Sequence, residues 1–253
     1  LGNKGEVHAS NSSAISPALK AADKSIITPL IYDKEYIPFL VEYCKKNKIK
    51  MIISLFDIDL YVLSLNKYKF EEVGCKVIVS DSEFIKICND KWLSFNYLKK
   101  HQFNTPMTYI DFELLQNDLT KNLINFPIII KPRWGMGSLS IYEADDADEL
   151  NVLYKKIKKE IQNSYMKYES KQDLDNAIIF QEKLKGQEYG MDVINDLKGN
   201  CVGVITRKKI AMRSGETDCA EIVNNEDLIE IGTKLGNITN HIANLDVDAF
   251  YSN

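Results

Sequence analysis

Lys131 stands at the end of a short apolar run and in front of a glycine-rich turn, and this arrangement is suited to holding phosphate. Ile128, Ile129 and Ile130 precede it, and Pro132 ends the run. The turn that follows contains Gly135, Gly137 and Ser138. Backbone N–H groups of such a turn can approach an anion closely, beside one fixed ammonium group. Taken alone, the segment is equally well explained as a β-hairpin with a glycine turn.

The two common glycine signatures for phosphate are absent. Gly-x-x-x-x-Gly-Lys-Ser/Thr does not occur, which excludes a P-loop by pattern. Gly-x-Gly-x-x-Gly is also absent, because Ser140 stands where the third glycine would be. A phosphate site at Lys131 is therefore of another kind.

Three later blocks follow in a definite order. Residues 178–193 predict a buried strand, a short connector, a glycine turn and an alternating strand. Residues 212–217 follow a further strand, and residues 244–250 predict a last short strand after a helix. In this order, the four blocks resemble the ATP-grasp superfamily, in the branch of the large subunit of carbamoyl-phosphate synthase. The resemblance extends from about Asp90 to the last residue.

The resemblance implies which residues bind ATP. Lys131 matches the cation that meets the α- and β-phosphates, and Lys91 matches a second cation. Gly135, Gly137 and Ser138 match the glycine-rich lid, with one glycine fewer than in carbamoyl-phosphate synthase. Trp134 either packs against the nucleotide or anchors this loop.

Other matched positions complete the implied site. The hinge that recognises adenine through its backbone matches Glu182, Lys183 and Leu184, and the carboxylate for the ribose hydroxyls matches Glu188. Arg213 matches a residue that approaches the γ-phosphate or the acyl phosphate, which makes it the catalytic candidate. Asp248 matches a ligand of Mg²⁺, or of Mn²⁺ in its place, and Asp246 is a nearby alternative. A Glu-x-Asn-Pro-Arg motif expected further on is absent, and we expect the chain to be trimmed at both ends.

Composition limits the other function classes. The net charge of −4 argues against nucleic acid as a partner. The five cysteines form no C-x-x-C pair, which fits free thiols and a cytoplasmic protein. No apolar run approaches the roughly 20 residues that a membrane span needs. A homodimer is compatible with the sequence.

Alternation of short strands and amphipathic helices predicts two domains. Residues 1–89 are expected to form an incomplete preliminary domain, Rossmann-like, with a parallel sheet and helices that include residues 33–47 and 59–73. Residues 90–253 are expected to form the ATP-grasp domain, with antiparallel sheets and flanking helices. There, Leu150, Leu153, Ile157 and Ile161 form an apolar stripe on a helix capped by Asp145 or Asp146. Residues 164–176 are expected to be a mobile loop.

The sequence thus predicts an ATP-dependent ligase. The resemblance implies that it phosphorylates a small carboxylate and lets an amine or a similar nucleophile displace the phosphate. The alternative is a nucleotide-binding regulatory or assembly subunit without turnover.

Overall fold

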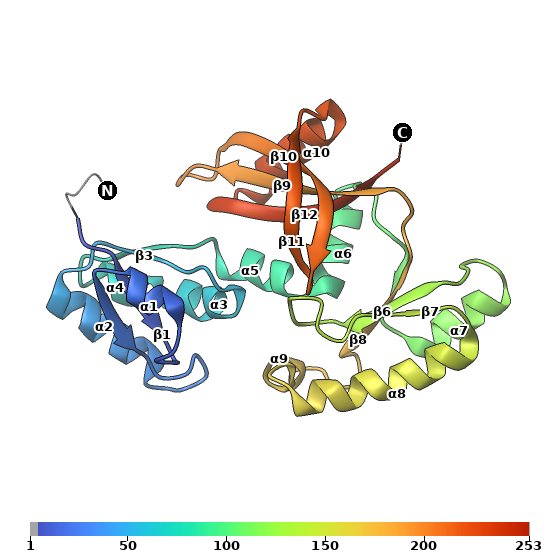
Figure 1. The fold of residues 1–253 in the computed structure, drawn as a ribbon, viewed down its shortest axis with the longest axis horizontal. Coiled ribbons are helices and arrows are strands. Elements are labelled where there is room, and N and C mark those ends of the chain that lie inside the picture. The colour runs from blue at the N-terminus through green and yellow to red at the C-terminus, as the bar shows by residue number, and fades with distance from the viewer. Residues whose placement is uncertain (1–4, 253) are drawn as a thin grey trace. The chain divides into compact units, whose positions relative to one another are not determined.

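The computed structural model describes residues 5–252 and divides into two compact units, Leu1–Ser82 and Glu83–Asn253 (Figure 1). The division falls within α5 (Ser82–Asn89). The expected boundary between residues 89 and 90 falls at the end of the same helix and stays a prediction. Among the described residues, no helix has the length and apolar character needed to cross a membrane.

The first unit alternates short strands with helices. Two parallel pairs, β1 with β2 and β3 with β4, confirm the expected parallel direction, but they form two separate two-stranded sheets instead of the single sheet expected. The helix expected over residues 59–73 is divided at Asn66, which ends α3 and begins α4. The elements are β1 (His8–Asn11), α1 (Pro17–Ala21), β2 (Lys24–Ile27), α2 (Tyr36–Asn47), β3 (Met51–Ile53), α3 (Asp57–Leu65), α4 (Lys67–Glu71) and β4 (Lys76–Ile78).

The second unit contains two four-stranded antiparallel sheets, which confirms the predicted fold class. Their strand orders are β5-β8-β6-β7 and β11-β10-β9-β12. The elements after α5 are α6 (Lys91–Lys100), β5 (Thr108–Tyr109), α7 (Phe112–Thr120), β6 (Ile128–Pro132), β7 (Tyr142–Ala144), α8 (Ala147–Asn163), α9 (Met166–Ser170), β8 (Ile178–Glu182), β9 (Gln187–Asn195), β10 (Cys201–Arg213), β11 (Glu216–Val223), α10 (Glu226–Thr239) and β12 (Ala243–Tyr251).

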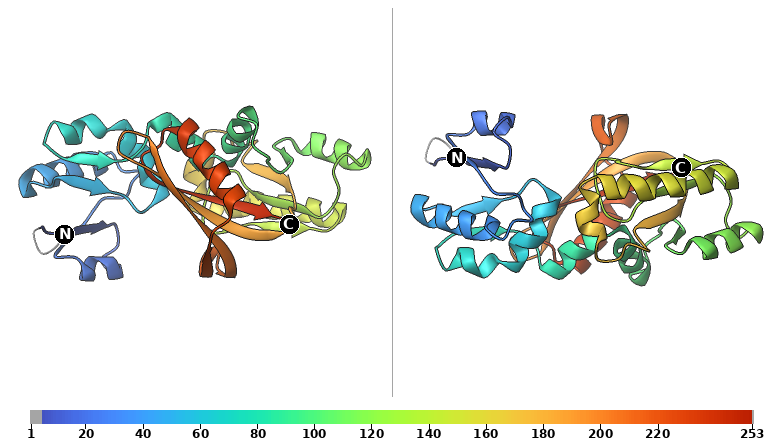
Figure 2. Two further views of the ribbon diagram at one scale, coloured as in Figure 1. Left: turned by 90° about the horizontal axis from the view of Figure 1, so that it is seen from above. Right: turned by 90° about the horizontal axis from the view of Figure 1, so that it is seen from below.

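Helix α8 covers the first of these sheets (Figure 2). The Asp146 side chain accepts from the Glu149 N–H, and the Glu149 side chain accepts from the Asp145 N–H. This reciprocal pair closes the helix N-terminus, as the sequence predicted. The buried stripe of α8 packs on Ile128, Ile130 and Phe180 in one core, and its members are Leu150, Ile157 and Ile161, with Leu153 partly buried. The core fixes β6, and with it the position of Lys131.

Helix α10 covers one face of the second sheet (Figure 2). Because side chains alternate along a strand, Met191 and Val193 point toward Leu228 of α10, while Glu188 and Asp192 point to the other face. That other face is charged. It displays, from three neighbouring strands, Glu188, Asp192, Arg207, Lys209, Asp246 and Asp248.

Candidate nucleotide site

Lys131 lies at the end of β6, where the Ile-rich core holds the strand. Its ammonium donates to the Gln181 side-chain oxygen on the neighbouring β8, at 2.7 Å. Burial lowers the pKa of Lys131, and the carboxylate of Asp248 acts in the opposite direction. The Lys131 ammonium therefore lies within electrostatic reach of Asp248, on the charged face of the second sheet.

Lys91 is the first residue of α6, and its ammonium donates to the backbone oxygen of Gly135 at 2.7 Å. Burial, together with the positive charge of Lys131, lowers the pKa of Lys91 to about 8. The structure thus brings together two lysines that lie forty residues apart in sequence. It also places one of them, Lys91, on the glycine-rich loop, while the phosphate-binding role that the resemblance implied for both lysines stays a prediction.

Both ammonium groups have neutral partners. An amide oxygen accepts from Lys131 and a carbonyl oxygen from Lys91. Within residues 5–252, no carboxylate lies within 4.0 Å of either one. Partly buried like charges without a counter-ion are costly, and a bound anion would offset that cost.

The loop between β6 and β7 has an unusual backbone. Gly135, Gly137, Ser138 and Ser140 all adopt positive φ angles, of 119°, 64°, 53° and 58°. Two serines in this region store strain, a feature that clusters at functional sites. Gly137 and Ser138 are exposed, and their N–H groups have no acceptor within the described part of the chain. The loop can therefore present N–H donors to an anion.

The floor of this loop comes from the segment expected to be mobile. Residues 164–176 contain α9 (Met166–Ser170), and Met166 is fully buried. A Cβ at Gly135 would lie 2.8 Å from the Met166 sulfur, so only glycine fits there. The segment is therefore helical in part and not a loop throughout, because a buried methionine anchors an otherwise polar stretch, and its mobility stays a prediction. Trp134 is also buried in the core, so it anchors the loop.

The hinge begins at Glu182, the last residue of β8, and continues through Lys183 and Leu184 toward β9. The Glu182 side chain accepts from the Met107 N–H at 2.9 Å, and the Glu182 backbone N–H donates to the Met107 backbone oxygen at 3.0 Å. Lys183 pairs with Glu143 at 2.7 Å. These side chains are used in structural contacts, which is compatible with recognition of a base by the backbone. Their role in adenine binding stays a prediction.

On the charged face, Glu188 and Asp248 share one cation that the sequence reading missed. The Lys209 ammonium lies 2.7 Å from Glu188 and 2.6 Å from Asp248. Burial lowers the pKa of Lys209, but hydrogen bonds to Asp248 and Glu188 outweigh it, and the net shift is upward. The cross-strand register that creates this contact is not visible in the sequence.

The expected metal site has little support from the residues themselves. Within the described ranges, no three His, Cys, Asp or Glu side chains are grouped so as to hold an ion. Asp248 is paired with Lys209, and its neighbour on β12, Asp246, is paired with Arg207 at 3.0 Å. Each of these carboxylates is thus paired with a cation of the protein within the described residues, and the role of Asp248 toward a metal stays a prediction.

Arg213 lies at the end of β10 and is 76% exposed, in an ion pair with Asp218. The hairpin tip beside it reaches the glycine-rich loop. A Cβ at Gly215 would lie 2.5 Å from the Ser138 hydroxyl oxygen and 2.6 Å from the carbonyl carbon of Gly137. The structure therefore places the β10–β11 hairpin tip against the loop, which brings the neighbourhood of Arg213 to the predicted lid.

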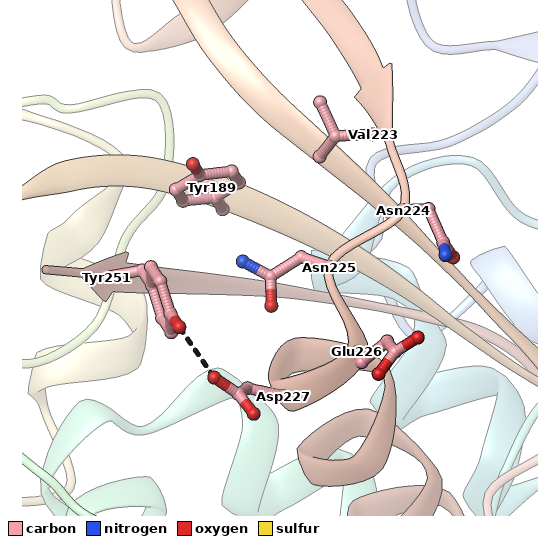
Figure 3. Close-up of a pocket in the computed structure, with 7 residues that line it drawn as sticks. All are labelled: Tyr189, Val223, Asn224, Asn225, Glu226, Asp227 and Tyr251. Carbon is pink, nitrogen blue, oxygen red and sulfur yellow. Dashed lines mark hydrogen bonds between the residues drawn. The ribbon is translucent and has the colours of Figure 1, made fainter. Parts of the chain in front are cut away.

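A pocket of about 430 Å³ lies on the face of the second sheet that packs on α10, opposite the charged face (Figure 3). Tyr189 and Tyr251 border it, and the Tyr251 hydroxyl donates to Asp227 at 2.5 Å. Both tyrosines pack on the α10 side, away from Glu188 and Asp248. This pocket is therefore separate from the two lysines.

Comparison with known families agrees with this geometry. Residues 124–249 match the ATP-grasp domain family, and residues 1–78 match the PylC-like N-terminal domain. The chain belongs to the ATP-grasp superfamily. The motifs suggested the branch of the large subunit of carbamoyl-phosphate synthase, and this branch describes the chain only coarsely. The match covers Lys131, the glycine-rich loop, the hinge, Glu188 and Asp248, whose individual roles stay predictions.

The chain is similar in sequence to one known ligase and in fold to several solved structures. The chain is 25% identical over 139 residues to the alpha-aminoadipate–LysW ligase LysX of Saccharolobus solfataricus, which covers 55% of this chain and 46% of that protein. The biotin carboxylase domain dimer of Hydrogenobacter thermophilus 2-oxoglutarate carboxylase, solved with MgADP, ADP and bicarbonate, has a TM-score of 0.71 at 15% identity, over 95% of this chain and 54% of that chain. The L-amino acid ligase of Bacillus licheniformis has a TM-score of 0.64 at 16% identity, over 91% of this chain and 55% of that chain. The chain thus spans about half the length of these relatives.

Proposed function

We propose that this protein is an ATP-dependent ligase that joins a small carboxylate to an amine or a similar nucleophile. The observation that carries the proposal is the pair of partly buried ammonium groups, Lys91 and Lys131, beside N–H groups of the glycine-rich loop. A polyphosphate would supply the negative charge that this place lacks. The names of LysX and of the L-amino acid ligase support the carboxylate–amine chemistry.

The reaction would proceed in two displacements. A carboxylate oxygen attacks the γ-phosphorus of ATP, the bond to the β-phosphate oxygen breaks, and ADP leaves. The amine then attacks the carbonyl carbon of the acyl phosphate, loses a proton, and inorganic phosphate leaves. In this scheme Lys91 and Lys131 hold the phosphates in place, the loop N–H groups contact the oxygens, and Arg213 approaches from the hairpin.

Mg²⁺ belongs to the proposal through the family, and it would neutralise charge on the phosphates. In this chain, Asp248 is the residue proposed to meet it. Glu188 is proposed for the ribose hydroxyls, and the hinge residues Glu182, Lys183 and Leu184 for the base. A cytoplasmic location and a homodimer complete the proposal, the latter supported by the dimeric biotin carboxylase domain.

Binding of ATP to Lys131→Met and to the unmodified protein tests the site by calorimetry. The variant should bind about 1–3 kcal/mol more weakly, as expected for the loss of a charge-assisted contact. Lys156→Met is a matched control, because that lysine lies on the exposed side of α8, 49% exposed. Equal affinities for the Lys131 and Lys156 variants would remove Lys131 from the site.

Turnover separates the ligase from the second candidate, a nucleotide-binding subunit without catalysis. The ion pair of Asp248 with Lys209 favours this second candidate, because it occupies the carboxylate proposed for the metal. Phosphate release should be measured with Mg-ATP and a panel of amino acids and other carboxylates, with mass spectrometry of the products. Tight ATP binding with neither phosphate nor product formed across the panel would favour the binding subunit.

A further inference from the structure

Arg133 makes a buried ion pair that reaches across the chain to Asp90. Its Nε lies 2.8 and 2.9 Å from the two Asp90 oxygens, and Nη2 lies 2.7 Å from one of them. Arg133 is 9% exposed and Asp90 3%. Such bidentate pairing fixes the planar guanidinium and the carboxylate in one relative orientation.

Asp90 also holds the beginning of α6. The same carboxylate accepts from the N–H groups of Trp92 at 3.0 Å and Leu93 at 3.1 Å, so it is the N-cap of the helix. The next residue is Lys91, whose backbone N–H donates to the Arg133 oxygen at 3.1 Å. Side chain and backbone together therefore attach the first turn of α6 to the end of β6.

Two further contacts hold Arg133 itself. Its Nη1 lies 2.9 Å from Asp173, and its guanidinium lies over the Trp134 ring, 4.4 Å from the ring centre. The Arg133 N–H donates to the Ala177 oxygen at 2.9 Å. The arginine therefore joins α6, β6 and the segment before β8, and it has little freedom to move.

We propose that Arg133 is a positioning residue which, through Asp90, holds the Lys91 ammonium on the glycine-rich loop and next to Lys131, so that the two lysines act as one phosphate-binding pair. The physical reason is that two like charges repel each other and favour separation. A long lysine side chain at a helix end would turn toward solvent unless its backbone were held at the junction. The assignment to phosphate rests on the proposed function.

Chemical labelling of Lys91 tests the positioning without any nucleotide. The intact protein is exposed to an amine-reactive reagent between pH 7 and 10, and modification of Lys91 is measured by mass spectrometry. In Arg133→Lys, which keeps the charge but loses the bidentate contact, the midpoint of Lys91 labelling should move to higher pH, toward an ordinary lysine. Labelling of Lys156, on the exposed side of α8, should keep its own profile. An unchanged Lys91 profile in a folded variant would overturn the proposal.

A double-mutant comparison then tests the link to phosphate binding. Arg133→Lys alone should weaken ATP binding by about tenfold, the usual scale for a charged contact. In a Lys91→Met background the same change should have almost no further effect, whereas in a Lys131→Met background it should keep part of its effect, because Lys91 can still meet phosphate there but is no longer repelled. Equal losses in all three backgrounds would mean a general structural role and would overturn the proposal.

Thermal unfolding of each variant is measured first. Binding is then compared at a temperature well below the lowest unfolding transition, where every variant is folded. Asp90→Asn is the second variant, since its side-chain oxygen can still cap α6 while the ion pair is lost. It should reproduce the labelling change of Arg133→Lys. If Lys91 labelling shifts as expected but the unmodified protein does not bind ATP, the positioning is upheld and the proposed function fails.

Discussion

The Lys209 ammonium lies 2.6 Å from a carboxylate oxygen of Asp248, and it reaches across an entire strand to do so. Lys209 belongs to β10 and Asp248 to β12, and both strands pair with β9. Gly190 stands opposite Asp248 on β9, and a Cβ there would lie 3.3 Å from the Arg207 guanidinium, so the glycine leaves room for Arg207 on the same face. Lys209 and Asp248 thus form a cross-strand contact on the charged face.

Lys209→Met should destabilise the protein by about 1–3 kcal/mol, less than the 3–5 kcal/mol for breaking a fully buried pair, because Asp248 is 60% exposed. The destabilisation is expected because the variant loses Lys209, the only cation that Glu188 and Asp248 share in the described structure. Urea unfolding measures the change. Lys208→Met is the control, since this neighbour points to the other face and makes no ion pair within residues 5–252. Adding Asp248→Asn to Lys209→Met should recover part of the loss, and no recovery would contradict the electrostatic explanation.

Contacts of this kind mark the limit of what the sequence could predict. The α8 stripe and its Asp146 cap were predictable, because both depend on residues within a few positions of one another. The pairs of Lys209 with Asp248 and of Arg133 with Asp90 depend on strand register and on residues about forty apart. Strand β11 was not predicted, because as an edge strand it is exposed on both faces and lacks an alternating pattern.

Helix α10 shows a second limit. In the sequence, Leu228, Ile231 and Leu235 are spaced as one apolar stripe that predicts the buried face. Ile231 is nevertheless 42% exposed, while Gly232 is buried against the sheet. Close approach of the helix at a glycine moves the contact face by one residue, and no periodicity of apolar side chains indicates this. The predicted site residues were found because the family resemblance supplied their roles, not because their contacts could be derived.

Gly232→Ala should therefore destabilise the protein, although alanine favours helices by about 1 kcal/mol over glycine. An added Cβ would lie 2.7 Å from a Val204 methyl carbon, and overpacking of this kind costs about 1–3 kcal/mol. The cost of this crowding should exceed the gain in helix propensity. Asn237→Ala on the exposed side of α10 is the control and should stabilise by roughly 0.5 kcal/mol. Stabilisation by both alanines in urea unfolding would refute the close packing.

Binding of ATP near pH 8.5 should take up protons. The pKa of Lys91 is lowered to about 8, so a large part of this lysine is neutral at that pH. A phosphate beside it favours the charged form, and the protein must then bind a proton from the buffer. Calorimetry in two buffers with different ionisation enthalpies should show the uptake at pH 8.5 and little of it at pH 6.5. Lys91→Met should remove it, and an unchanged uptake in this variant would exclude Lys91 as the source.

The same lowered pKa has a consequence for stability without nucleotide. Between about 8 and the ordinary value of 10.5, the unfolded chain binds more protons at this position than the folded protein. The contribution of Lys91 to the free energy of unfolding therefore rises with pH through this window. Suppose that Lys91→Met has a higher free energy of unfolding than the unmodified protein at pH 7. The gap between the two free energies of unfolding should then narrow toward pH 10, because only the unmodified protein gains stability from Lys91 in this range.

Gly215→Ala should loosen the contact between the β10–β11 hairpin and the glycine-rich loop. At a φ of 83°, alanine is strained, and its Cβ would lie 2.5 Å from the Ser138 hydroxyl oxygen. The hairpin tip must then move away, since backbone on the other side cannot yield. Hydrogen exchange of the Met136 and Leu139 N–H groups, which donate to the Tyr165 hydroxyl and the Met136 oxygen, should become faster in the absence of nucleotide, by about tenfold for each 1.4 kcal/mol lost locally. Gly203→Ala, on β10 with open space around it, is the matched control and should leave this exchange unchanged. Equal exchange rates in both variants would show that the hairpin does not hold the loop.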